Sequence, residues 1–367
     1  MGSSLSYDGG RGRVEQEEAF AVYRNTTSLF LLCVISLFAP LAASAVTIDT
    51  VPVGDVGNAN DPTTGNLYGG VDYGYRIGTT EVTNAQYVEF LNAKAASDPL
   101  ALYSTNMGGD PRGGITRSGV SGSYTYAPKT DMGNKPVNYV SWYDSIRFAN
   151  WRNNGGQASS DTETGAYTLG ALGAGGVPID GLSITRNVGA TWFLPSMNEW
   201  YKAAYFQPAA QGGDVDNYWL YPTASNTSPR VATANSVGDI SNPGENVANH
   251  SSGADWNSQN GNVTTVGSAG PLSQSFYGTS DQGGNVWEWN EDVTGDSFRM
   301  FGGGSFIHDS TFMQPWVIPV VVVVAQVFPQ DENATVGFRV AAVPEPSSYV
   351  LAALGLVGLV VWKRRKR

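Results

Sequence analysis

The sequence has almost no cysteine and almost no histidine. Its 367 residues include one cysteine, Cys33, and two histidines, His250 and His308. Cys33 lies in an N-terminal apolar run that we expect to be removed, which would leave no disulfide, thiolate metal site or cysteine nucleophile in the mature chain. An iron site of two histidines and one carboxylate would need both histidines, which carry no ligand spacing. A serine triad would also have to recruit one of them, and no G-x-S-x-G elbow is present.

Charged residues are scarce, and few of them are basic. Lys, Arg, Asp and Glu make up 14% of the chain, which has a formal net charge of −11. The first 45 residues hold three Arg and four acids, and the last 21 hold five basic residues. The remainder therefore has 13 basic and 28 acidic side chains, a net charge of −15. Nucleic-acid binding is disfavoured, because phosphate contacts need basic patches. Divalent cations are the favoured partners.

The N-terminus is typical of a secretory signal peptide. The apolar run Leu29–Leu41 is followed by Ala-Ala-Ser-Ala at Ala42–Ala45, an A-x-A-like cleavage site. Residues 1–45 are thus predicted to be an N-terminal extension and signal peptide. The stretch Met1–Tyr23 is long for such a signal and carries three glutamates, which favours a true start further along the chain.

The C-terminus combines a short motif, an apolar run and a basic end. Pro344-Glu345-Pro346 precedes the 14 residues Tyr349–Trp362 and the basic Lys363–Arg367. This run is shorter than the ~20 residues that span a bilayer, and its basic end should stay cytoplasmic. Residues 343–367 resemble the PEP-CTERM sorting signal of Gram-negative bacteria. That resemblance implies an exosortase partner, transient membrane anchoring, and a final place in the cell envelope, at the surface or outside the cell. A plain membrane anchor is the alternative.

The intervening residues 46–342 are predicted to form one α+β domain with long irregular loops. Three capping-box patterns predict helices at 83–96, 141–152 and 197–207, beginning at Thr83, Ser141 and Ser196. Alternating apolar residues predict strands at 46–53 and 67–77. The Gly-, Asn- and Ser-rich stretch 211–270 is expected to be disordered or to wrap a metal. No internal repeat indicates a propeller or solenoid.

Glycines, tryptophans and carboxylates crowd into Phe276–Asn290, FYGTSDQGGNVWEWN. Glycine permits positive φ, and tryptophan anchors a turn in the core. Asp281 and Glu288 supply carboxylates, and the turn between them could direct carbonyl oxygens inward, the ligand set that calcium prefers. The alternative is a packed turn with surface acids.

Six blocks of sequence resemble, in order, those of the formylglycine-generating enzyme (sulfatase-modifying factor) family. They are EVTNAQYVEFLNA at 81–93, KPVNYVSWYDSIRFANW at 135–151, FLPSMNEWYKAAY at 193–205, GGNVWEW at 283–289, GGGSF at 302–306 and GFRVA at 337–341. The resemblance implies a C-type-lectin-like fold of the sulfatase-modifying factor type, often with bound calcium.

The resemblance also implies ligands for two calcium sites. A first site would use Asn249 and the carbonyl that follows it, with Asp255 or Asn257 as the partner some residues later. A second, structural site would use the Asp281 side chain, the Gly284 and Val286 carbonyls, and the Glu288 carboxylate.

The family's oxidase chemistry depends on two copper-binding cysteines shortly after the GGS block. His308 and Met313 stand at those positions here. Both residue types bind copper, but they lack the two-thiolate geometry, and ordinary replacement after loss of function is the alternative. Trp316–Ala325, WVIPVVVVVA, replaces a more polar segment; it is either a buried strand or the product of a local reading-frame error.

Three functions remain open. A non-catalytic, calcium-stabilised surface or matrix domain that binds a glycan or an envelope protein is favoured, because a fold carries no function without its site. A formylglycine-type oxidoreductase acting on a protein cysteine through a non-cysteine metal site is the second. A purely structural matrix protein is the third.

Overall fold

The computed structural model describes residues 1–2, 46–295, 297–315 and 327–343. The chain separates into two units, Met1–Ser44 and Ala45–Arg367, and all the described helices and strands lie in the second. The predicted signal peptide, the apolar run 316–325 and the sorting signal beyond Val343 lie outside the described residues. Within those residues, no helix is long and apolar enough to cross a membrane.

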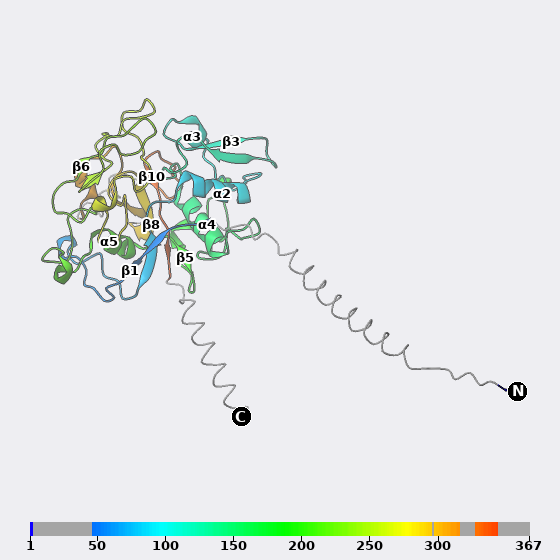
Figure 1. The fold of residues 1–367 in the computed structure, drawn as a ribbon, viewed down its shortest axis with the longest axis horizontal. Coiled ribbons are helices and arrows are strands. Elements are labelled where there is room, and N and C mark those ends of the chain that lie inside the picture. The colour runs from blue at the N-terminus through cyan, green and yellow to red at the C-terminus, as the bar shows by residue number, and fades with distance from the viewer. Residues whose placement is uncertain (3–45, 296, 316–326, 344–367) are drawn as a thin grey trace. The chain divides into compact units, whose positions relative to one another are not determined.

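A four-stranded sheet brings the two ends of the domain together (Figure 1). Its order is β1 (Thr50–Val53), β2 (Tyr75–Gly78), β11 (Ala341–Ala342) and β5 (Trp192–Phe193), with every pair antiparallel. The strand predicted at 46–53 is therefore confirmed over its second half.

The strand predicted at 67–77 is wrong over residues 67–74, which form bends and irregular backbone. The side chains of two asparagines bind backbone groups that would otherwise pair with a neighbouring strand. Asn58 Nδ2 donates to the Gly69 carbonyl at 2.8 Å, and the Gly70 amide donates to Asn60 Oδ1 at 2.6 Å. Side-chain amides thus take the place of strand-to-strand hydrogen bonds before Tyr75, where β2 begins.

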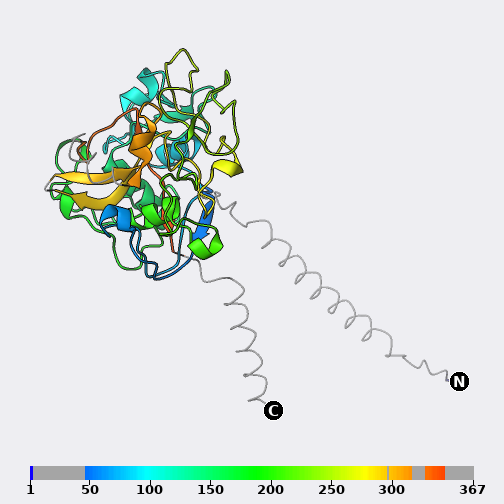
Figure 2. The ribbon, with the colours of Figure 1, turned by 90° about the vertical axis from the view of Figure 1, so that its left-hand side faces the viewer.

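The second sheet carries the central turn. β8 (Trp287–Thr294) and β9 (Phe298–Gly302) form the antiparallel hairpin seen in yellow and gold in Figure 2, and β10 (Val336–Gly337) pairs parallel with β8. Two further two-stranded sheets join β3 (Ile115–Ser118) to β4 (Thr125–Pro128) and β6 (Arg230–Val231) to β7 (Val247–Ala248). The stretch 211–270 is built around this last pair.

The three predicted helices are present as α2 (Asn84–Lys94), α4 (Trp142–Asn153) and α5 (Met197–Tyr205). Each begins with a capping box in which both hydrogen bonds form, as the sequence predicted. A short helix, α3 (Thr105–Gly109), was not predicted. Single 3₁₀ turns occur at Pro62–Thr64, Ala174–Gly176, Gly181–Ser183, Ala209–Gln211, Pro271–Ser273 and Ser310–Met313.

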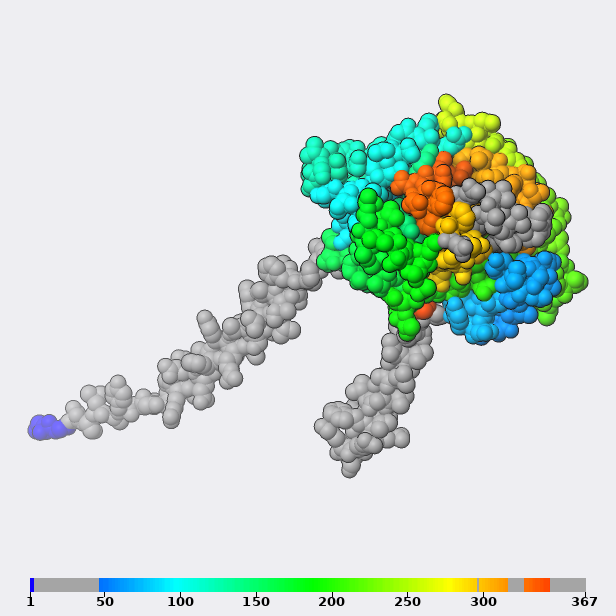
Figure 3. Space-filling model, turned by 180° about the vertical axis from the view of Figure 1, so that it is seen from behind, coloured from blue at the N-terminus to red at the C-terminus, as the bar shows by residue number. Residues whose placement is uncertain are grey.

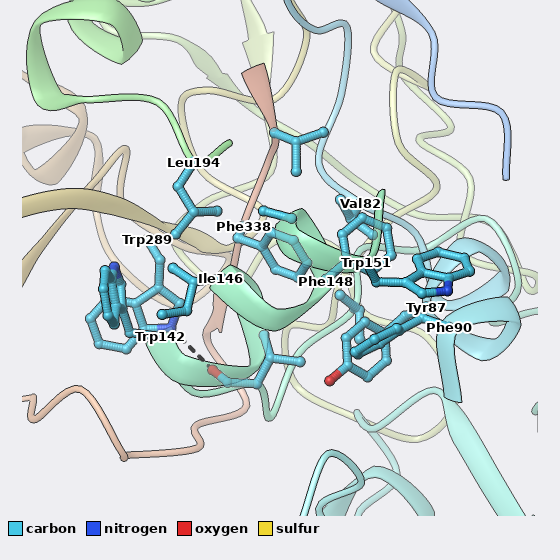
Figure 4. Close-up of a cluster of buried hydrophobic side chains, with 14 of the residues drawn as sticks. Val82, Tyr87, Phe90, Trp142, Ile146, Phe148, Trp151, Leu194, Trp289 and Phe338 are labelled. Atoms are coloured by element: carbon cyan, nitrogen blue, oxygen red, sulfur yellow. Dashed lines mark hydrogen bonds between the residues drawn. The ribbon is translucent and has the colours of Figure 1, made fainter. Parts of the chain in front are cut away.

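Aromatic side chains fill the space between the helices and the sheets (Figure 4). Phe148 of α4 lies against Phe90 of α2 and against Phe338, with ring centroids 5.6 and 5.4 Å apart. Fully burying each such ring contributes roughly 1.5–3 kcal/mol. Phe338 belongs to the GFRVA block, so the last strands are tied to the first helices through the core.

Candidate functional site

The central turn is anchored by an ion pair with no exposure to solvent. Arg339 donates to both carboxylate oxygens of Glu288, with Nε–Oε2 and Nη2–Oε1 distances of 2.5 and 2.6 Å, and both side chains are 0% exposed. Trp200 Nε1 donates to the same Oε2 at 2.7 Å. Arg339 also donates to the carbonyls of Gly78 and Ser280. The Glu288 charge is therefore neutralised by a guanidinium.

Glu81 is a second buried carboxylate near this pair. Its Oε1 accepts from Asn285 Nδ2 at 3.0 Å, while its Oε2 has no hydrogen-bond partner among the described residues. Burial raises the pKa of Glu81 well above its usual range; Asp281 and Glu288 raise it further, and Arg339 opposes them. The site therefore favours the neutral acid form of Glu81.

Asp281 sits in the turn with a positive φ of 62°. Its Oδ2 accepts from the Gly267 amide at 2.5 Å. Loss of solvation raises the pKa of Asp281 to about 6, although the Gly267 hydrogen bond and Arg339 lower it. Asp281 borders a cavity of ≈ 10 Å³, which is also lined by Thr223 and Ser273. That volume is close to the minimum for one water molecule.

Gly284 and Asn249 bring the turn and β7 into contact. A Cβ on Gly284, whose φ is +84°, would lie 2.2 Å from the Asn249 carbonyl oxygen, so no larger residue fits. Asn249 Nδ2 donates to the Asn262 carbonyl and to Asn285 Oδ1 at 2.9 and 3.1 Å. Its Oδ1 is buried and has no partner among the described residues.

Both expected partners of Asn249 form hydrogen bonds to other groups, and their role as calcium ligands stays a prediction. Asp255 Oδ1 accepts from the Gly261 amide, and Asn257 Nδ2 donates to the Pro111 carbonyl. Within the loop, the backbone carbonyl of Asn262, 13 residues after Asn249, and the Thr264 hydroxyl both accept from the Asn249 side chain.

The chemistry of these donors fits a cation only in part. Among the described residues, no three His, Cys, Asp or Glu side chains converge to hold a metal. Glu288 would have to share its carboxylate with Arg339. In favour of a cation are the Asn249 oxygen without a partner, the desolvated Asp281 carboxylate, and the excess of buried acids over the single guanidinium. The calcium ligands therefore stay a prediction.

His308 and Met313 occupy different surroundings. The His308 ring lies between Trp287 and Phe312, with centroids 5.2 and 4.9 Å away, and its Nδ1 bonds to Ser305 Oγ at 2.7 Å. Met313 is buried beside Tyr221 and Ala248 instead. The two side chains thus have different packing neighbours.

Both ring nitrogens of the other histidine, His250, form hydrogen bonds. His250 Nε2 faces the Pro229 carbonyl at 3.1 Å, and Nδ1 lies 2.9 Å from Ser251 Oγ. Because a carbonyl can only accept, Nε2 carries the proton and Nδ1 accepts from the serine. Burial also lowers the pKa of His250. This neutral ring has no nitrogen left for a metal.

A groove of ≈ 740 Å³ opens away from the turn. Figure 3 shows the face on which the green segment around the 3₁₀ turn Gly181–Ser183, the gold β8–β9 hairpin and the orange segment after residue 326 meet. Apolar and polar side chains both line the groove, among them Tyr143, Ile179, Asp180, Ser183, Phe328 and Gln330. Its volume is that of a typical small-ligand site.

Sequence reasoning missed Glu81, Asn285 and Arg339 as members of the buried centre. All three lie in the blocks that carried the family resemblance, and Arg339 is the one basic residue of GFRVA. A buried glutamate requires a cationic or hydrogen-bonding partner, and that requirement was the available signal.

Comparisons with known proteins agree with both resemblances. The family model of the sulfatase-modifying factor enzyme 1-like domain matches residues 69–343, and that of the PEP-CTERM protein-sorting motif matches residues 342–366. A comparison with curated protein sequences gave no significant match. The sorting motif implies recognition by an exosortase and export to the cell envelope or surface.

Solved structures with a similar fold include three with low sequence identity. CarF is 22% identical over 82% of this chain and 99% of its own, with a TM-score of 0.43. Variable protein 1 of Treponema denticola is 18% identical over 82% and 99%, with a TM-score of 0.38. PvdO from Pseudomonas aeruginosa is 14% identical over 81% and 92%, with a TM-score of 0.37.

The family match covers most of the chain, and the few helices and several small sheets are the predicted α+β, C-type-lectin-like architecture. The chain therefore belongs to the family of sulfatase-modifying factor enzyme 1-like domains.

Proposed function

We propose that the exported domain is a non-catalytic binding module of the cell surface or extracellular matrix. The observation that carries this proposal is that His308 and Met313 pack against different neighbours. These residues stand where the family's cysteine chemistry is expected, yet one ring packs against Trp287 and the other side chain packs against Tyr221. A metal oxidase needs convergent ligands.

The groove beside β9 is the surface that we assign to ligand binding, and a glycan is the ligand class that fits it. Sugars present apolar C–H faces and hydroxyl edges together. Phe328 and Ile179, 40% and 67% exposed, offer apolar faces, while Asp180 and Gln330 offer polar edges. Exposed aromatic surface in a concave site is characteristic of binding.

Calcium is proposed as a structural component rather than a catalytic one. The Asp281 carboxylate and the carbonyls of Gly284 and Val286 would hold it, beside Glu288, and Asn249 would belong to a separate site. Calcium supplies only charge neutralisation among oxygen ligands. A cation that binds the folded state alone raises stability with its concentration.

A glycan array with the full chain purified in detergent tests the binding function. Saturable binding that is lost in Phe328→Ala and Asp180→Asn, but kept in the distant Val215→Ala, would support the groove. The same sample is incubated with copper, oxygen and a cysteine-containing sulfatase peptide, and the peptide mass is measured. Turnover that disappears in His308→Ala would replace this proposal with the oxidoreductase. No binding to glycans or envelope proteins would favour the structural matrix role.

Thermal melts with calcium and with chelator test the metal separately. Asp281→Asn should abolish a calcium-dependent rise in melting temperature, and Asn249→Ala should reduce it. Glu288 is unsuitable as the probe, because its replacement also breaks the pair with Arg339. Coincident melts of the unaltered protein would remove calcium from the proposal and leave a packed turn.

A further inference from the structure

A second concave site lies where the described chain ends. A pocket of ≈ 380 Å³ opens on the four-stranded sheet, and its lining includes Thr50, Arg76, Trp192 and Val343. All four strands contribute to it. The register places Ala342 opposite Arg76 on one side and opposite Trp192 on the other, so these side chains share one face of the sheet.

Arg76 is positioned to bind an anion in this pocket. Its Nε and Nη2 donate to Thr50 Oγ1 and to the Thr50 carbonyl, at 2.8 and 2.5 Å, which holds the guanidinium in place. Its third nitrogen, Nη1, has no hydrogen bond among the residues that the structure describes. Trp192 supplies a partly exposed indole on the same face, stacked on Arg152 at 4.4 Å. A guanidinium beside an indole suits an acidic segment with apolar rings.

Such a segment follows Val343 in the same chain. The Val343 amide donates to the Thr191 carbonyl at 3.2 Å, so strand pairing continues to the edge of the pocket. The next residue, Pro344, has no N–H and cannot continue the ladder. Glu345 follows, two residues after a residue that lines the pocket, which is about 7 Å of extended chain.

We propose that this pocket binds the sorting motif of the same chain, Pro344-Glu345-Pro346. The prolines lie against Trp192, as proline-rich segments do in aromatic-lined grooves, and the Glu345 carboxylate pairs with Arg76. Binding is intramolecular, and a short tether corresponds to an effective concentration on the order of millimolar. The exosortase therefore competes with the folded domain for the motif, and folding of the domain controls when the motif is available.

Trp-induced quenching of a bimane dye tests this proposal on the full chain in detergent. The dye is attached through Ser347→Cys in a Cys33→Ser background, which leaves the motif intact. Trp192→Phe removes the quencher, and Arg76→Gln removes the charge partner. The control is Arg230→Gln, an exposed arginine on β6. Unchanged melting transitions confirm that each variant is folded.

The expected result is quenched emission in the parent and in Arg230→Gln, with loss of quenching in both Trp192→Phe and Arg76→Gln. Equal emission in all four proteins would overturn the proposal. Loss of quenching in Trp192→Phe alone would overturn the ion pair. Quenching that depends on protein concentration would assign the pocket to a second copy and overturn intramolecular binding. No glycan or metal enters this measurement, so its failure leaves the proposed function untouched.

Discussion

Glu288 and Arg339 form a bidentate ion pair across 51 residues of chain, with neither side chain exposed to water. The pair joins β8 to the segment between β10 and β11, and Trp200 attaches α5 to the same carboxylate. Two sheets and a helix thus meet at one charge pair. Its removal should affect the whole domain rather than one loop.

Glu288→Gln should cost roughly 3–5 kcal/mol of unfolding free energy, because Arg339 would remain buried without its counter-ion. Urea denaturation at neutral pH measures the loss. Glu163→Gln is the comparison: Arg147 is only 1% exposed, but Glu163 is 29% exposed and Arg147 keeps a hydrogen bond to the Gly176 carbonyl, so the loss should be smaller than at Glu288. Similar losses of unfolding free energy in the two variants would show that the buried pair contributes no more to stability than the partly exposed pair.

The elements that the sequence predicted well are those with local causes. The caps at Thr83, Ser141 and Ser196 each involve a residue three positions away, and all three formed. The strand predicted at 67–77 failed for a non-local reason, since Asn58 and Asn60, outside that stretch, took over its backbone hydrogen bonds. Alternation of apolar residues cannot reveal such competition.

The sequence predicted the turn that carries the site but not the residues that contact this turn. Asp281 and Glu288 stood out because glycine and tryptophan surround them. The bond from Asn285 to Glu81 spans 204 residues, and nothing local to either residue indicates it. The family resemblance covered both blocks, but only the fold shows that Arg339 pairs with Glu288.

Gly284→Ala should be far more damaging than Gly278→Ala. Both glycines have positive φ, +84° and +88°, which costs an alanine roughly 1–2 kcal/mol. At Gly278 the added Cβ would meet nothing closer than Val51 Cγ1 at 3.6 Å. At Gly284 it would collide with the Asn249 carbonyl, so β7 must move away from the turn. Thermal melts compare the two; equal melting temperatures would mean that the turn adapts freely.

Lys202→Met should change how stability depends on alkaline pH. Burial lowers the pKa of Lys202 to about 8, while Asp55 and Asp72 oppose the shift. The folded state therefore binds fewer protons than the unfolded state between about pH 8 and 10.5, and this residue's contribution to stability rises with pH there. The urea midpoint of the parent, measured relative to that of Lys202→Met, should therefore rise with pH over that range. A constant difference would contradict the assignment.

The contribution of Asp281 to stability should instead fall as pH rises, at acid pH. Its pKa rises from an ordinary 3.8 to about 6 in the folded state, so the folded protein binds its proton more tightly than the unfolded chain does. The stability from this group is full below about pH 4 and is lost as pH rises through about 6. With solvent screening, the loss is on the order of 1–2 kcal/mol.

Urea unfolding of the parent and Asp281→Asn, in chelator at several pH values between about 4 and 7, isolates this contribution from other buried acids. The free-energy difference between the two proteins should shift against the parent as pH rises. Parallel curves would mean that the Asp281 carboxylate is solvated. Saturating calcium offers a further comparison, because a cation bound at Asp281 favours the ionised carboxylate and should reverse the shift. If calcium leaves the curve of the parent unchanged, the turn binds no calcium at Asp281.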